Sequence, residues 1–242
     1  MIKLIDVSKT YPLDKGNAVP AVRGVSLEIQ KGEFVIVVGR SGSGKTTLLN
    51  LAAGLTRPSS GETYLDGVNL WSMSDEKQSA LRSRSLGFVF QVPSLISSLT
   101  ALENVILPTM FCDTQNGTNH SERAVELLQR VGLADKLSSY PRQLSAGQQQ
   151  RIVIARALMN QPQVLLADEP TSNLDEQTEL EIMGLFRDLH ISLGITIVMV
   201  THTRQLVAFG TRAIEMANGQ VVNGKVPVNG STPKIQEDFY VS

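Results

Sequence analysis

Apolar residues fall into two patterns along the chain. Near the amino terminus, apolar and polar residues alternate over 2–11 and 21–29, which is typical of strands with one buried face. Further along, continuous apolar runs within 34–38, 164–169 and 195–202 are typical of strands buried on both faces of a parallel sheet. The patterning therefore predicts an antiparallel β region beside a parallel α/β core.

The remaining segments complete this picture. Residues 61–67 and 85–91 are predicted as strands, and residues 12–20, with Pro12, Gly16 and Pro20, as a loop. Between about 93 and 161 the apolar spacing becomes helical, and residues 176–193 form a further predicted helix. The helical block is thus inserted between the strands of the α/β core.

Composition narrows the class of protein. The chain has 242 residues, a net charge of −1 and no block of Lys or Arg, which argues against a nucleic-acid or membrane-surface binder. Its single cysteine, Cys112, excludes an internal disulfide. The longest apolar runs are far shorter than the roughly 20 residues that span a bilayer, and the charged, alternating start is unlike a signal peptide. We expect a cytoplasmic protein, and any membrane role would have to come through a partner.

The stretch GRSGSGKT, residues 39–46, follows a predicted buried strand and opens a predicted helix at 45–53. In this context the pattern is that of a phosphate-binding loop, whose glycines let backbone N–H groups converge on anionic oxygens. Lys45 is expected to reach the β- and γ-phosphates of a nucleotide, and the hydroxyl of Thr46 to bind Mg²⁺. A chance glycine turn is the alternative, and the flanking strand and helix argue against it.

A second strand ends in two carboxylates, Asp168 and Glu169. Asp168 is placed to complete the Mg²⁺ shell, and Glu169 to act as the general base for an attacking water. Taken alone, the pair is better explained as the solvated acidic end of a strand. The phosphate loop is what favours the catalytic interpretation.

Three further residues are candidates for the nucleotide site, and each could instead have an ordinary structural role. Gln91 ends the predicted strand 85–91 and can touch Mg²⁺ or the attacking water, or be a polar residue at a sheet edge. His202 ends another core strand and can donate to a γ-phosphate, although a lone histidine is more often structural. Tyr11 can stack on adenine, or be an ordinary strand aromatic.

The stretch LSAGQQQR, residues 144–151, has two interpretations of its own. Ser145 and Gln148 have the spacing of a capping box. The same helix start, with its glycine, is also suited to hold an anion.

Taken together, the order and spacing of these motifs, above all LSAGQQQRIVIARAL followed by VLLADEPTSNLD, resemble the ATP-binding-cassette (ABC) ATPases over residues 1–222. The resemblance implies a role for each matching position. Glu169, His202 and Gln91 would be catalytic, and Thr46, Gln91 and Asp168 would hold Mg²⁺. The ATP-binding residues would be Tyr11, Gly39, Arg40, Ser41, Gly42, Ser43, Gly44, Lys45, Thr46, Thr47, Gln91 and His202. Ser145, Ala146, Gly147, Gln148 and Asp175 would contact the ATP of a partner subunit.

The resemblance also implies an architecture and partners. The fold would be α/β, with a P-loop NTPase (RecA-like) core, an N-terminal antiparallel β subdomain and an inserted helical subdomain at about 93–161. The ATPase domain would span 1–222, leaving 223–242 as a tail. ABC ATPases work as head-to-tail dimers in which one chain's signature faces the other chain's phosphate loop. We therefore expect ATP and Mg²⁺ as ligands, a homodimer, and integral membrane subunits that hold the chain at the cytoplasmic face of the membrane.

Finer features are similar to the cassettes that serve lipoprotein release and macrolide export, which favours export, extraction or mechanical transmission. One departure from the family pattern is Ala146, where the signature usually has glycine. A methyl group is small, so the anion site is expected to survive.

Two other classes of protein share parts of this pattern. A soluble ABC-type ATPase acting on DNA or ribosomes would carry coiled coils, zinc modules or a second ATPase unit, and none is seen in the sequence. A small-molecule phosphotransferase would share the phosphate loop and lack the signature. Co-purification with a membrane protein or with nucleic acid discriminates between these classes.

Overall fold

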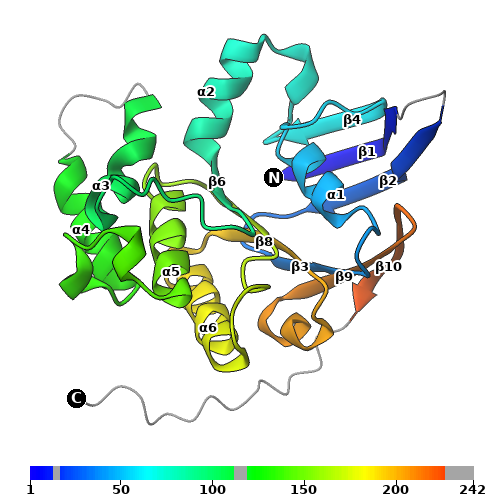
Figure 1. The fold of residues 1–242 in the computed structure, drawn as a ribbon. Helices are drawn as coiled ribbons and strands as arrows, with labels where there is room; N and C mark the ends of the chain where they lie inside the picture. Colours follow the sequence, from blue (N-terminus) through cyan, green and yellow to red (C-terminus); the bar gives the residue numbers. More distant parts are fainter. Residues whose placement is uncertain (13–16, 112–118, 227–242) are drawn as a thin grey trace.

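The structure is a computed structural model, and it describes residues 1–12, 17–111 and 119–226. In these residues the chain forms a smaller and a larger β-sheet, with helices on both faces of the larger one (Figure 1). The smaller sheet is antiparallel and has the strand order β2-β1-β4-β5. Its strands are β1 (Ile2–Pro12), β2 (Ala18–Ile29), β4 (Ser60–Leu65) and β5 (Val68–Asn69).

The larger sheet has the strand order β10-β9-β3-β8-β7-β6, and only the pairing of β10 with β9 is antiparallel. Its strands are β3 (Phe34–Val38), β6 (Leu86–Val89), β7 (Val164–Asp168), β8 (Thr196–Thr201), β9 (Arg212–Ala217) and β10 (Gln220–Val226). The continuous apolar runs predicted as parallel strands are β3, β7 and β8, at the centre of this sheet.

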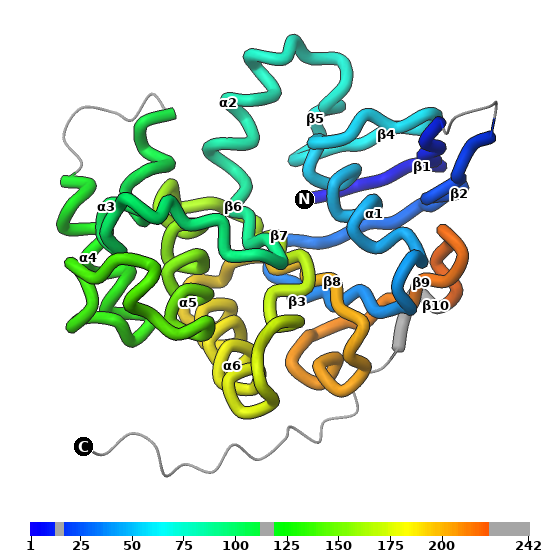
Figure 2. The backbone as a smooth tube through the Cα atoms, viewed as in Figure 1, coloured from blue at the N-terminus to red at the C-terminus, as the bar shows by residue number. Residues whose placement is uncertain are grey.

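Helices connect these strands. The α-helices are α1 (Lys45–Ala52), α2 (Asp75–Ser85), α3 (Ala101–Ile106), α4 (His120–Arg130), α5 (Ala146–Ala157) and α6 (Glu176–Leu193). Short 3₁₀ helices are η2 (Leu70–Ser72), η3 (Leu107–Phe111), η4 (Ala134–Lys136), η5 (Pro141–Gln143) and η6 (Arg204–Phe209). Figure 2 shows the chain leaving the sheet after β6, passing through α3 to α5 at one side, and returning in β7. No helix of the described residues combines the length and apolar character needed to cross a membrane.

The two faces of the larger sheet bury separate cores. Along β3, Phe34 and Ile36 belong to the core that includes α5 and α6, whereas Val35 and Val37 belong to the core shared with α1 and the antiparallel sheet. This split follows from the two-residue period of a strand, whose successive side chains point to opposite faces. As a result, α1 and α5 lie on opposite faces of the sheet.

Several elements differ from the sequence prediction. The predicted loop at 12–20 is shorter, because β1 includes Pro12 and β2 starts at Ala18. Helix α2 was not predicted, because only Gln78 and Ser85 of its residues are buried and no apolar face marks it. Its signal was the start, where Ser74 caps the helix and acidic residues fill the first turn.

The carboxyl-terminal strands β9 and β10 were also missed, and the predicted domain boundary at residue 222 falls inside β10. Most of the predicted tail, 227–242, lies outside the described residues, as does Cys112. Within the predicted helical block at about 93–161, the first α-helix is short, since α3 ends at Ile106 and the chain continues as η3, which contains Pro108.

Helix α6 has a buried face and an exposed face, and comparing substitutions on the two faces tests how the helix packs. Phe186 is fully buried against the sheet, whereas Ile191 on the same helix is 72% exposed. We expect Phe186→Ala to lower the free energy of unfolding by about 3–5 kcal/mol, because it leaves a cavity in the core. Ile191→Ala should change it by less than about 0.5 kcal/mol. Urea denaturation measures both, and equal losses would contradict this packing.

Candidate functional site

Residues 39–44 form the loop between β3 and α1, and the helix that follows has an unusual start. Its N-cap is Gly44, with a left-handed φ of 97°, and no side chain caps the helix. Each of the other α-helices in the described residues has a side-chain cap, from Ser74, Thr100, Asn119, Ser145 and Asp175. The first N–H groups of α1 are therefore open to an anionic ligand.

The loop is packed so closely that side chains at two of its three glycines, Gly39 and Gly44, would collide with backbone. A Cβ atom at Gly39 would lie 2.4 Å from the carbonyl oxygen of Met216, and one at Gly44 would lie 2.2 Å from that of Ala21. In the same loop the hydroxyl of Ser43 is buried and has no hydrogen-bond partner. A compact cradle with an unpartnered buried hydroxyl fits a bound phosphate group.

Lys45 is buried at the first position of α1. Its ammonium group donates to the carbonyl oxygens of Gly39 at 2.9 Å and Arg40 at 3.2 Å. It also lies 3.6 Å from Oε1 of Glu169. The charge is thus held inside the loop by bonds that a phosphate oxygen can replace.

Thr46 and Asp168, the two residues expected to hold Mg²⁺ beside the phosphate loop, are hydrogen-bonded to each other. The Thr46 hydroxyl donates to Oδ1 of Asp168 at 3.0 Å. Burial raises the pKa of the Asp168 carboxyl, and the neighbouring charge of Glu169 raises it further, while the bond from Thr46 and the charge of Lys45 lower it. The ionised form of Asp168 is therefore disfavoured among the protein groups that surround it.

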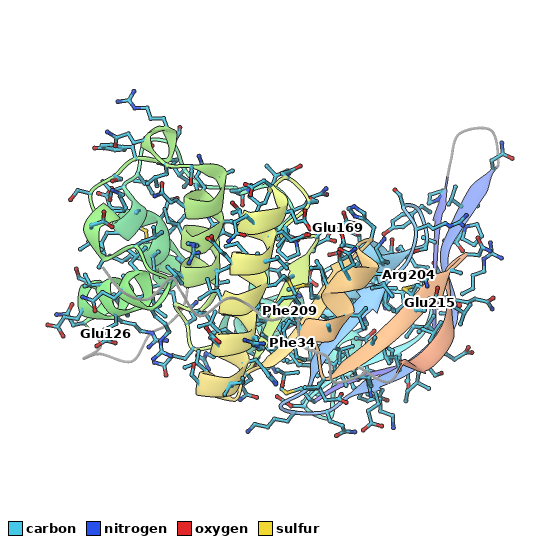
Figure 3. All side chains as sticks on the ribbon, turned by 90° about the horizontal axis from the view of Figure 1, so that it is seen from below. Phe34, Glu126, Glu169, Arg204, Phe209 and Glu215 are labelled. Atoms are coloured by element: carbon cyan, nitrogen blue, oxygen red, sulfur yellow. The ribbon has the colours of Figure 1, made fainter. Side chains whose placement is uncertain are left out.

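Glu169 follows β7 in a strained conformation that the sequence did not reveal. Its φ is 43°, in the left-handed region that non-glycine residues rarely adopt, and its N–H donates to the carbonyl of Val200. Nδ1 of His202 lies 2.9 Å from Oε2 of Glu169, which fits donation of a ring N–H to the carboxylate. Figure 3 shows Glu169 at the edge of the sheet between α6 and η6, away from Phe34 in the core.

Gln91 and Tyr11 lie at the margins of this cluster. Strand β6 ends at Val89, so Gln91 is the second residue after the strand rather than its last residue, and its side chain is exposed. Tyr11 is 38% exposed in β1, with the ammonium of Lys9 5.2 Å from the centre of its ring. The structure thus brings together Lys45, Thr46, Asp168, Glu169 and His202, and leaves these two residues outside that network.

The signature residues lie elsewhere. At the start of α5, Ser145 and Gln148 form the predicted capping box, each side chain bonded to the other's backbone N–H. Asp175 caps α6 through bonds from the N–H and hydroxyl of Thr178. Within the described part of the chain, no hydrogen bond or ion pair joins Ser145, Gln148 or Asp175 to residues 39–47.

Comparison with known proteins agrees with this geometry. A family model described as ABC transporter matches residues 22–172, more than half of the chain. The chain belongs to the ABC transporter family. An ABC transporter ATP-binding protein of Thermotoga maritima is 47% identical over 221 residues, which cover 91% of this chain and 93% of that protein.

Two further relatives bear on what this cassette does. The dimeric ATP-binding cassette MJ0796, solved in a post-hydrolysis state with ADP and Pi, superposes with a TM-score of 0.86 at 41% identity and covers 95% of this chain and all of that one. The macrolide export ATP-binding/permease protein MacB of Rhodopirellula baltica is 45% identical, and the match covers 91% of this chain and 32% of that protein. The present cassette is thus a nucleotide-binding ATPase component of an ABC transporter, and a role on DNA or ribosomes is not favoured.

The raised pKa of Asp168 predicts a pH-dependent effect on stability. Because the pKa is higher in the folded chain, the stability gained from protonation is present below the unfolded pKa and is lost as pH rises through the folded one. Without nucleotide, Asp168→Asn should therefore raise the melting temperature at pH 7.5, with the gain shrinking towards about pH 4.

Asp135 provides a control of opposite sign for this measurement. Its pKa is lowered, chiefly by a hydrogen bond from Lys136, and the carboxylate is exposed. Asp135→Asn should not stabilise the cassette at pH 7.5. A melting temperature of Asp168→Asn below that of the wild type at pH 7.5 would contradict the assigned shift.

Proposed function

We propose that residues 39–47 hold the phosphates of ATP and that the adjoining carboxylates hydrolyse it. The uncapped start of α1 is the observation that carries this proposal, because its N–H groups have no side-chain partner while those of the other described α-helices do. The buried ammonium of Lys45 and the unpartnered hydroxyl of Ser43 support it. When the phosphates bind, Lys45 exchanges the loop carbonyls for phosphate oxygens.

The proposed metal site is small. Thr46 and Asp168 supply two oxygens, and no group of three or more His, Cys, Asp or Glu side chains in the described residues is placed to hold a metal ion. This donor set fits Mg²⁺, which is commonly bound by one or two protein oxygens together with substrate phosphates and water. The bound ion would supply positive charge to the phosphates. It would also lower the free-energy cost of keeping the partly buried Asp168 carboxyl ionised. Gln91 is proposed to approach the same ion from the segment that follows β6.

Glu169 is proposed as the general base. One of its carboxylate oxygens is held by His202, and the other faces the ammonium of Lys45. Once Lys45 turns to the phosphates, that second oxygen is free to accept a proton from a water molecule aimed at the γ-phosphate. His202 then keeps the carboxylate in place, and its exposed ring is proposed to reach the γ-phosphate. Tyr11 is proposed to stack on adenine beside the loop.

The signature is proposed to act on the ATP of a second copy of the chain. Helices α1 and α5 pack on opposite faces of the sheet, so the signature of one chain is separated from its own phosphate loop. A head-to-tail dimer places Ser145, Ala146, Gly147, Gln148 and Asp175 against the partner's nucleotide. The dimeric state of the related MJ0796 cassette supports this arrangement.

Exposed apolar side chains beside Gln91 and at the end of η3 are proposed as contacts for the membrane subunits. Phe90 and Val92 flank Gln91 and are 43% and 65% exposed. Met110 and Phe111, at the end of η3, are more than three-quarters exposed. Such side chains favour burial against a partner, which would place the cassette on the cytoplasmic face of the membrane. The ATP-binding/permease name of MacB, of which this chain matches about a third, favours a role in export, extraction or mechanical transmission.

The proposed domain limits follow from the same assignment. The ATPase unit is proposed to comprise residues 1–222, with the helical subdomain at about 93–161 and the tail at 223–242. Strand β10, Gln220–Val226, crosses the proposed limit at residue 222.

Replacing the base should separate binding from hydrolysis. We expect Glu169→Gln to bind fluorescent ATP as tightly as the wild type and to release phosphate about 10²–10⁴ times more slowly. Glu76→Gln, an exposed carboxylate on α2, is the control and should hydrolyse normally. Near-wild-type phosphate release by Glu169→Gln would remove Glu169 as the base.

Mixing two inactive variants tests the composite site. Lys45→Ala disables the phosphate loop, and Ser145→Asp preserves the helix cap while its charge repels a phosphate. In the mixed dimer one site keeps both Lys45 and Ser145, so random pairing should restore about a quarter of wild-type ATPase activity. If the signature instead acted on its own chain's nucleotide, the mixture would stay as inactive as each variant alone.

A further inference from the structure

The turn between β9 and β10 has a contact that no motif assigns. The two strands pair from Ala217 and Gln220, so Asn218 and Gly219 alone form the turn. Both have left-handed φ values, of 50° and 77°, as a type I′ turn requires. Figure 1 shows the turn beside β2 and the start of α1.

The tip of this hairpin connects the phosphate loop to the antiparallel sheet. The N–H of Gly219 donates to the carbonyl of Ser43 at 3.0 Å. The carbonyl of Gly219 accepts from the N–H of Arg23, in β2, at 2.8 Å. One glycine residue thus uses both its backbone polar groups to hold two segments that lie far apart in the sequence.

The same contact is also sterically tight. A Cβ atom at Gly219 would lie 2.9 Å from the carbonyl oxygen of Ala21, and the Cα of Gly219 would lie 3.5 Å from a Cβ at Gly44. Any side chain at Gly219 therefore pushes the tip away from β2 and disturbs its bond to the loop.

The bond to Ser43 has a geometric consequence for the nucleotide. The Ser43 carbonyl and the Gly44 N–H belong to one planar trans peptide, so they point in opposite directions. Holding the carbonyl on the hairpin side turns the Gly44 N–H to the other side, at the start of α1, where the phosphates are proposed to bind. We propose that Gly219 is a positioning residue for ATP binding, which acts by orienting the peptide between Ser43 and Gly44.

This inference rests on the proposed function of residues 39–47. An oriented peptide contributes to the binding of every nucleotide with a β-phosphate, in the ground state and the transition state alike. Its loss therefore weakens affinity and leaves the chemical step intact. If the turn served only to hold the fold together, its loss would lower the stability of the protein and would not weaken nucleotide affinity selectively.

The chain contains a matched control turn. Asp66 and Gly67, between β4 and β5, have φ values of 49° and 79°, nearly those of Asn218 and Gly219. No atom lies within 4 Å of a Cβ built at Gly67. Gly67→Ala therefore introduces the same backbone strain as Gly219→Ala, without the contact to β2 or the phosphate loop.

The experiment compares the full-length variants by fluorescent ATP and ADP binding and by steady-state hydrolysis. We expect Gly219→Ala to weaken both nucleotides and raise KM about tenfold, with kcat at saturating ATP within about twofold of the wild type. Gly67→Ala should match the wild type in affinity and KM. Equal affinities of Gly219→Ala and Gly67→Ala would overturn the inference, as would a fall in kcat with KM unchanged.

Two further variants distinguish a folding defect in Gly219→Ala, and a wrong assignment of residues 39–47, from a failure of the inference itself. Gly219→Asn introduces a side chain that tolerates a left-handed φ, and its Cβ makes the same close contact with Ala21 as that of Gly219→Ala. It should therefore weaken ATP binding even if Gly219→Ala does not fold. Wild-type affinity in a folded Gly219→Asn would count against the inference. Lys45→Ala tests the proposed site itself, because unchanged ATP binding in that variant would refute the assignment of residues 39–47 independently of the hairpin.

Discussion

The hydrogen-bonded register of three neighbouring strands is the constraint on which the site depends. In this register Val38 of β3 pairs with Thr201 of β8, and Val200 of β8 pairs with Asp168 of β7. The phosphate loop begins directly after Val38, His202 follows Thr201, and Glu169 follows Asp168. Because the strands are parallel, all three emerge at the same edge of the sheet. A slip of one residue would turn every side chain of a strand to the other face, and would separate the lysine from the carboxylates.

Several polar groups of the proposed ATP site and of the signature are bonded within the chain. Lys45 bonds to its own loop carbonyls, Ser145 and Gln148 cap α5, and Asp175 caps α6. Burial of unpaired polar groups is costly, so these bonds stabilise the cassette when no ligand is present. In the proposed dimer, nucleotide and partner would exchange such bonds for new ones of similar kind. This exchange is compatible with repeated opening and closing of the site.

The accuracy of the sequence prediction followed the strength of the local signal. Helix α6 was predicted at 176–193 and has those bounds, because apolar periodicity, the Asp175 cap and the Gly194 stop agree. Helix α2 was missed because it buries almost no apolar surface. The hairpin of β9 and β10 carried an Asn–Gly turn between strand-like runs, a signal that was available and not used.

The sequence by itself determined the chemical groups of the site and the elements that carry them. The phosphate loop, the two carboxylates and the capping box are local patterns, and each can be recognised from a few neighbouring residues. Only the tertiary structure decided which of these groups meet. Strand order brought His202 to Glu169, the two sheet faces separated α1 from α5, and the hairpin tip reached Ser43. These contacts join residues up to about 180 positions apart, and no local periodicity encodes the pairing of strands across such distances.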